Sequence, residues 1–293
     1  MPCWQRAGRW LILGATAAGK TQKNGCAAGG ICAGKIYYGI KTGLNEAFVI
    51  DAATRERLIA EDERSGEVIK PFLAGRDVKR YVAPKVKNYV FIPWHFPLHR
   101  DSSISGVSEE AEQLFQKDYP AVYQHLLQFK EKLEKRNKDE TGVRYEWYAL
   151  QRHAASYWEE FEKEKILFPD IALKMEATIS TEGEFCGNTI YFIPSSDLKL
   201  LGFLCSKLVL YFYSNITSSI RGGYLRFIRQ YLEQIPVPTG LNESAELEIL
   251  VDKLIQTRRG ELEGNISEIE KEIDRVVFEL FGLGDGEILT IVG

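Results

Sequence analysis

The sequence predicts an α+β fold of mixed small sheets with packed helices, ending in an antiparallel helical hairpin. Three observations support this class. Short apolar runs bounded by proline, glycine or polar residues recur from residue 35 onward and are typical of strands. Segments with helical spacing of apolar residues lie between and after them. The strands and helices do not repeat as regular βαβ units, and 293 residues are enough to bury a sizeable core.

The expected elements follow in chain order. We expect a first helix at TRERLIAED and a second one capped by Ser108, and Pro120 starts a third that runs to about Arg136. Ser196 or Asp197 is expected to cap one long buried helix, LKLLGFLCSKLVLYFY. A basic helix, YLRFIRQYLEQ, and the two helices of the terminal hairpin come last. The expected strands are IYYGI, EAFVID, YVFIPW, KILFPD and NTIYFIP.

Charge and composition suggest three regions: a leader at 1–35, a main domain at 36–240 and the hairpin region at 241–293. The net charge is −4, but residues 1–35 carry five basic and no acidic side chains, whereas residues 242–293 carry 13 acidic and five basic ones. We expect the leader, rich in Gly, Ala and Cys, to be atypical, either artificial in origin or misread. The acidic hairpin would be repelled by a phosphate backbone, so it is expected to brace the fold or to contact protein.

Two further features bear on location and cofactors. The five cysteines have no regular spacing, which argues against a disulfide framework and for the cytoplasm. Cys26 and Cys32 lack a matching pair of ligands, so no metal site is expected. The apolar segment after Asp197 contains Lys199 and Lys207 and is marginal in length for a membrane span, so no membrane contact is expected.

The segment GATAAGKT, from Gly14 to Thr21, fits the phosphate-loop pattern and raises a rival function. Such a loop needs a helix after it, yet QKNGCAAGGICAG has four glycines, each costing about 1 kcal/mol in a helix relative to alanine. A nucleotide hydrolase acting through Lys20 therefore stays a remote alternative.

Three separated polar or basic clusters could contact nucleic acid. The turn KTGLNE offers a mobile charge, a hydroxyl and an amide, although a plain β-turn would use the same residues. Residues 198–232 contain no acidic side chain, and Arg221 lies in a flexible turn where a guanidinium could bind guanine or phosphate. Each basic residue taken singly is also compatible with ordinary surface charge. The expected DNA contacts are Lys41, Thr42, Asn45, Arg76, Lys79, Arg80, Arg221, Arg226 and Arg229.

Several segments, taken in their order along the chain, together resemble one protein family. They are GIKTGLNEAFVID, IKPFLAGRDVKRY, YPAVYQHLLQFKEKLEKR, KILFPDIA, NTIYFIP, RGGYLRFIRQYLEQIPVP and EIDRVVFELFGL. This series is similar to the TaqI-like C-terminal specificity domain. That domain supplies target recognition to adenine-specific DNA methyltransferases and to type IIG restriction-modification enzymes. The resemblance runs from about Lys35 to the C-terminus.

The resemblance implies a module that chooses which adenine of duplex DNA is methylated. The family's catalytic half carries a glycine-rich cofactor loop and an Asn-Pro-Pro-Tyr or Asn-Pro-Pro-Phe motif, and neither motif occurs in this sequence. No catalytic residue is therefore assigned here. The resemblance implies S-adenosylmethionine as the cofactor of the parent enzyme. It implies double-stranded DNA and a methyltransferase catalytic domain or subunit as partners. A protein-interaction remnant without DNA binding is the alternative.

Overall fold

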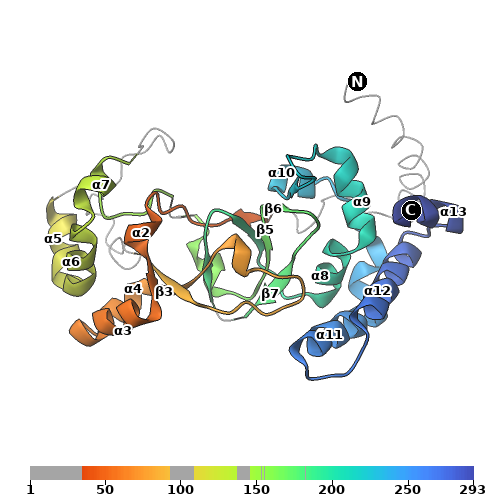
Figure 1. The fold of residues 1–293 in the computed structure, drawn as a ribbon, viewed down its shortest axis with the longest axis horizontal. Helices are drawn as coiled ribbons and strands as arrows, with labels where there is room; N and C mark the ends of the chain where they lie inside the picture. The colour runs from red at the N-terminus through yellow and green to blue at the C-terminus, as the bar shows by residue number, and fades with distance from the viewer. Residues whose placement is uncertain (1–34, 93–108, 137–145, 153, 155, 182) are drawn as a thin grey trace.

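A computed structural model describes residues 35–92, 109–136, 146–152, 154, 156–181 and 183–293. These residues form an elongated molecule in which sheets occupy the middle and helices cover both ends (Figure 1). The predicted α+β class is confirmed. Within the described part of the chain, no helix is long and apolar enough to cross a membrane. The phosphate-loop-like segment at Gly14 to Thr21 lies outside the described residues.

Two four-stranded sheets and a two-stranded ribbon make up the described β-structure. The first sheet has the strand order β1-β9-β5-β7 and is antiparallel throughout. The second sheet has the strand order β2-β4-β3-β8, in which β3 and β8 are parallel. In the ribbon, β6 pairs with β10. The first sheet contains β1 (Tyr37–Tyr38), β9 (Ile190–Ile193), β5 (Lys165–Pro169) and β7 (Thr178–Ser180). The second sheet contains β2 (Val49–Asp51), β4 (Asn88–Phe91), β3 (Ile69–Leu73) and β8 (Phe185–Cys186). The ribbon contains β6 (Ile171–Ala172) and β10 (Leu225–Arg226).

Local sequence explains where several helices begin. Asp51 accepts a hydrogen bond from the backbone of Thr54 at 2.8 Å and so caps α3, and Pro120 occupies the first position of α6. The helices of the N-terminal half are α2 (Asn45–Phe48), α3 (Ala52–Glu61), α4 (Ser65–Val68), η2 (Gly75–Asp77), α5 (Glu109–Asp118), α6 (Pro120–Leu127), α7 (Lys130–Glu134) and η3 (Trp158–Glu162). Those of the C-terminal half are α8 (Leu198–Leu204), α9 (Lys207–Ile216), α10 (Arg229–Leu232), η4 (Thr239–Glu243), α11 (Ala245–Arg259), α12 (Ile266–Leu280) and α13 (Asp285–Val292).

Two hydrophobic cores hold these elements together. The first core lies around the second sheet and helices α3 and α5 to α7, with Phe91 and Phe115 fully buried in it. The second core joins the first sheet to helices α8, α9, α11 and α12 and includes Phe203 and Val251. Burial of this apolar surface is the main favourable contribution to folding on both sides of the molecule.

Two of the expected long helices are broken. The segment after Asp197 forms α8 and α9, because the Ser206 hydroxyl accepts a hydrogen bond from Val209 and begins a new helix. Ser206 also donates to the carbonyl oxygen of Phe203 at 2.8 Å, which completes the end of α8. The helix expected from Pro120 to Arg136 is likewise divided, into α6 and α7.

The terminal hairpin consists of α11 and α12, which lie side by side (Figure 1). Gly260, with a φ of 76°, ends α11, and Asn265 caps α12. The hairpin packs on α8, where a Cβ atom at Gly202 would lie 2.5 Å from Val251 Cγ2. The structure therefore favours the expectation that the hairpin braces the fold. Helix α13 follows it and was not expected.

Candidate nucleic-acid interface

An open cleft of about 840 Å³ lies where several of the predicted DNA contacts meet. Segments from α2, η2, β5 to β6 and the turn before β10 border it, although they lie far apart in the sequence. Its polar and aromatic lining includes Asn45, Arg76, Lys79, Asp170, Glu176 and Tyr224. The cleft thus combines cationic and amide groups, the kinds of side chain that contact phosphates and base edges in DNA complexes, with two carboxylates and an aromatic ring.

The segment that presents Arg76 and Lys79 is held by its own backbone. Gly75 donates a hydrogen bond to Thr189 Oγ1 at 3.0 Å, and Asp77 accepts one from the backbone N–H of Ala74 at 2.8 Å. Asp77 therefore caps the short helix η2. Arg76 and Lys79 are exposed on either side of this anchored turn.

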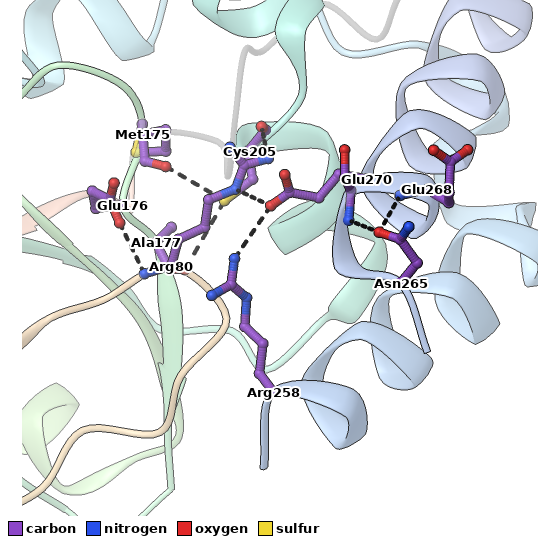
Figure 2. A network of polar contacts seen from close by, with 10 residues as sticks. Arg80, Met175, Glu176, Ala177, Cys205, Arg258, Asn265, Glu268 and Glu270 are labelled. Carbon is purple, nitrogen blue, oxygen red and sulfur yellow. Dashed lines mark hydrogen bonds and ion pairs between the residues drawn. The ribbon is translucent and has the colours of Figure 1, made fainter. Parts of the chain in front are cut away.

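Arg80 lies in a different environment from the two basic residues before it. Its Nη2 atom donates to the carbonyl oxygen of Cys205 at 2.6 Å, and its Nε atom lies 3.6 Å from Glu270 of α12 (Figure 2). Arg258 of α11 lies 3.5 Å from the same carboxylate. Because the Arg80 side chain is 13% exposed and turned toward the helices, it serves as a link between the cleft segment and the hairpin.

The polar turn that begins at Lys41 makes most of its contacts inside the protein. The backbones of Lys41 and Arg152 exchange two hydrogen bonds of 2.9 Å. Thr42 is buried; its hydroxyl donates to Asn45 Oδ1 at 2.6 Å, and its carbonyl oxygen accepts from Arg136 at 2.7 Å. Of the three polar residues predicted here, Asn45 is the one that lines the cleft.

Arg136 itself fixes this corner of the structure. The residue is buried, and its guanidinium donates to the carbonyl oxygens of Leu133 and Trp147 as well as to that of Thr42. Trp147 and the adjacent Tyr148 are buried too, so these aromatic side chains belong to the packing of this corner.

The prediction of one basic helix over YLRFIRQYLEQ is wrong for the first half of that segment. Residues Leu225–Arg226 form β10, and α10 begins at Arg229, so the two arginines do not share a helix face. The reason is a long-range pairing: Arg226 lies opposite Ile171, and the backbone N–H of Phe227 donates to the carbonyl oxygen of Asp170 at 2.7 Å. Arg226 is exposed, whereas Arg229 is paired with Glu233 at 2.6 Å.

Arg221 lies in the turn that leads into β10. Gly222 and Gly223 have φ values of 85° and 80°, a conformation that glycine adopts without strain. Arg221 is exposed on this turn. Tyr224, which belongs to the segment expected to form a basic helix, precedes β10, is 42% exposed and lines the cleft.

Two carboxylates accompany the basic groups and were not predicted as part of the site. Glu176 accepts a hydrogen bond from the backbone N–H of Arg80 at 3.0 Å. Partial burial raises the pKa of Asp170, and the positive charge of Arg226 acts in the opposite direction. Carboxylates can accept hydrogen bonds from the amino group of cytosine, so their presence does not argue against DNA contact.

Comparison with known proteins gives a consistent result. The model of the TaqI-like C-terminal specificity domain family matches residues 70–237, more than half of the chain. The Type II methyltransferase M.MjaIV of Methanocaldococcus jannaschii is 26% identical over 251 residues, which cover 83% of this chain and 77% of that protein. The Type II methyltransferase M.PaeR7I of Pseudomonas aeruginosa is 31% identical over 134 residues, which cover 44% of this chain and 21% of that protein.

A solved structure has a similar arrangement of elements. The type IIL restriction-modification enzyme MmeI, determined in complex with DNA, superimposes on 88% of this chain with a TM-score of 0.64 and 12% sequence identity. This likeness concerns the fold. The match covers 34% of the MmeI chain, so the present chain corresponds to about a third of that enzyme.

Proposed function

Because the chain belongs to the TaqI-like C-terminal specificity domain family, we propose that it is the module that recognises the DNA target of a type II or type IIG restriction-modification methyltransferase. It binds duplex DNA through contacts to phosphates and reads a short sequence at the base edges. Its site of action is the cytoplasm, together with the DNA.

The observation that carries this proposal is the convergence of separate segments on one cleft. Asn45, the pair Arg76 and Lys79, and the turn before β10 come from three parts of the chain, yet all border it. A folded core gains little stability from exposed basic side chains placed side by side, whereas a polyanion would bind to them.

We divide the set of proposed contacts by role. Arg221 is our first candidate for reading a base, since an arginine on a flexible exposed turn can donate two hydrogen bonds to guanine. Lys41 and Arg229 are candidates for peripheral phosphate contacts. Thr42 and Arg80 are assigned to support, because both are engaged inside the protein. The remaining proposed contacts are Asn45, Arg76, Lys79 and Arg226.

We further propose that a methyltransferase domain or subunit acts with this module on an adenine. The adenine would leave the base stack and enter the partner's active site, as enzymes that modify bases require. S-adenosylmethionine, bound to that partner, would supply the methyl group. The present chain determines which adenine reaches the reaction by fixing the position of the DNA.

Selection from a random duplex library tests the module by itself. The purified chain is incubated with the library at about 50 mM and at about 200 mM salt, a range over which phosphate-driven binding falls steeply. An enriched short motif would support an autonomous sequence reader. Salt-sensitive binding without a motif would mean that readout requires the methyltransferase. Absence of binding at both concentrations would contradict the proposal and favour a protein-interaction remnant.

A pair of variants links the binding to the cleft. Lys79→Ala is expected to reduce the magnitude of the slope of log K against log salt concentration by about one, the value for one lost phosphate contact. Lys117→Ala, which removes the same charge from an exposed position on α5, a helix that does not border the cleft, is the matched control and should leave the slope unchanged. Equal effects of both variants would show that overall charge and not the cleft determines the binding.

A further inference from the structure

The ribbon of β6 and β10 exposes apolar side chains toward the cleft. Ile171 is 43% exposed and Leu173 is 57% exposed, while Ala172 between them is buried. The partner strand alternates in the same manner, with Leu225 buried and Arg226 exposed. One face of the ribbon therefore joins the second core, and the other presents aliphatic groups beside a guanidinium.

The core does not require these two aliphatic side chains, and the backbone beneath them is firmly held. Phe227, which follows the ribbon, is fully buried and stacks on Tyr213 with ring centroids 4.7 Å apart. The Tyr213 hydroxyl donates to the carbonyl oxygen of Arg226 at 2.6 Å and accepts from the backbone N–H of Ile228 at 3.1 Å. Ile171 and Leu173 are thus presented on a fixed support, which is the arrangement that a recognition surface needs.

The charges around this apolar face indicate the kind of partner. Arg226 lies on the same face, and Arg76 and Lys79 line the same cleft. The carboxylates of Asp170 and Glu176 also line it; the first is partly buried, and the second is bonded to the backbone of Arg80. This surface places exposed basic side chains beside the apolar side chains of Ile171 and Leu173. It is therefore complementary to a polyanion that has apolar groups between its charges.

Duplex DNA has such a group in its major groove. The C5 methyl group of thymine is the apolar feature of the base edges, and the major groove is wide enough to admit a two-stranded ribbon. We propose that Ile171 and Leu173 recognise thymine by contact with this methyl group, while Arg226 binds the adjacent phosphate or base edge. This inference rests on the proposed function, because it specifies how the same cleft reads its target.

Replacement of thymine by uracil, which lacks the methyl group, tests the inference. The duplex enriched by the selection above is resynthesised with uracil at each thymine in turn, and its affinity for the full chain is measured. Loss of one buried methyl contact should weaken binding about four-fold at one or two positions. In Leu173→Ala and Ile171→Ala, thymine and uracil duplexes should bind with more nearly equal affinity at those positions. Ile249→Ala, which changes an aliphatic residue 67% exposed on α11, is the matched control and should discriminate as the wild type does.

The possible failures are distinguishable. If the chain binds no duplex, the proposed function itself fails. If it enriches a motif but tolerates uracil at every thymine, or if it binds DNA without sequence preference, DNA binding stands and thymine recognition is overturned. A third result would overturn it as well. In that case the fluorescence of 2-aminopurine, placed in the duplex beside the contacted base pair, rises when the wild type binds but not when Leu173→Ala binds, and replacing thymine by uracil leaves the affinity unchanged. The ribbon would then be a wedge between base pairs.

Discussion

Replacing Arg80 by methionine separates a structural role from a DNA contact. Methionine retains an apolar stem of similar length but removes the guanidinium, which donates to Cys205 and lies near Glu270. A charged hydrogen bond to a carbonyl oxygen contributes about 1.5–3 kcal/mol. The pair with Glu270 adds little, because its 3.6 Å separation is too long for a hydrogen bond and that carboxylate keeps Arg258. We therefore expect a loss of about 2 kcal/mol in the free energy of unfolding.

Urea unfolding and DNA titration together check this expectation. The urea midpoint of Arg80→Met should fall by about 0.5–1 M, and the salt dependence of DNA binding should keep its slope wherever the variant is folded. Arg57→Met is the control for stability, since Arg57 is 52% exposed on α3 and its ion pair with the exposed Glu61 is a single surface pair, so its loss should change the midpoint little. An unchanged midpoint with a slope lowered by about one would refute the structural assignment and make Arg80 a phosphate contact.

Three further changes test the packing that supports the cleft. Gly39→Ala should prevent stable folding, because the new Cβ would lie 2.1 Å from the carbonyl oxygen of Gly187; circular dichroism of the purified variant checks this. Lys165→Met should abolish a rise in stability with pH. Burial lowers the pKa of Lys165 in the folded protein, so just below the unfolded lysine pKa of about 10.4 the unfolded chain binds more protons, and wild-type stability increases as the pH approaches that value from below. Arg136→Leu should cost about 3 kcal/mol in urea unfolding, because three carbonyl oxygens lose a buried charged donor; an unchanged midpoint would contradict that role.

The strands and helices that depend on local pattern were predictable. The apolar run of β5 and the capped helix α12 carry their own signals within a few residues. The break between α8 and α9 was missed because apolar residues continue through it, so the capping action of Ser206 was hidden in a uniform segment.

The candidate site was less predictable than the fold, because long-range pairing determines it. The ribbon strands are two residues long and pair across more than fifty residues of chain, so Tyr224 and Arg226 resembled part of a helix. Lys79 and Arg80 are adjacent and chemically similar, yet the first lines the cleft and the second is bonded to the carbonyl oxygen of Cys205. The sequence identifies the basic residues of such a segment, but the tertiary contacts determine which of them are exposed to solvent.

The pairing of early strands with late ones has a consequence for biosynthesis. Strand β1 needs β9 as its partner, and the cleft needs both Asn45 and Tyr224. At roughly 5–20 residues per second, the ribosome takes on the order of ten to forty seconds to make the chain between those two residues. Strand β1 stays unpaired until β9 has been made, so the nascent chain must be kept from aggregating through this edge. A ribosome stalled before β10 would therefore release a product in which β6 lacks its partner strand.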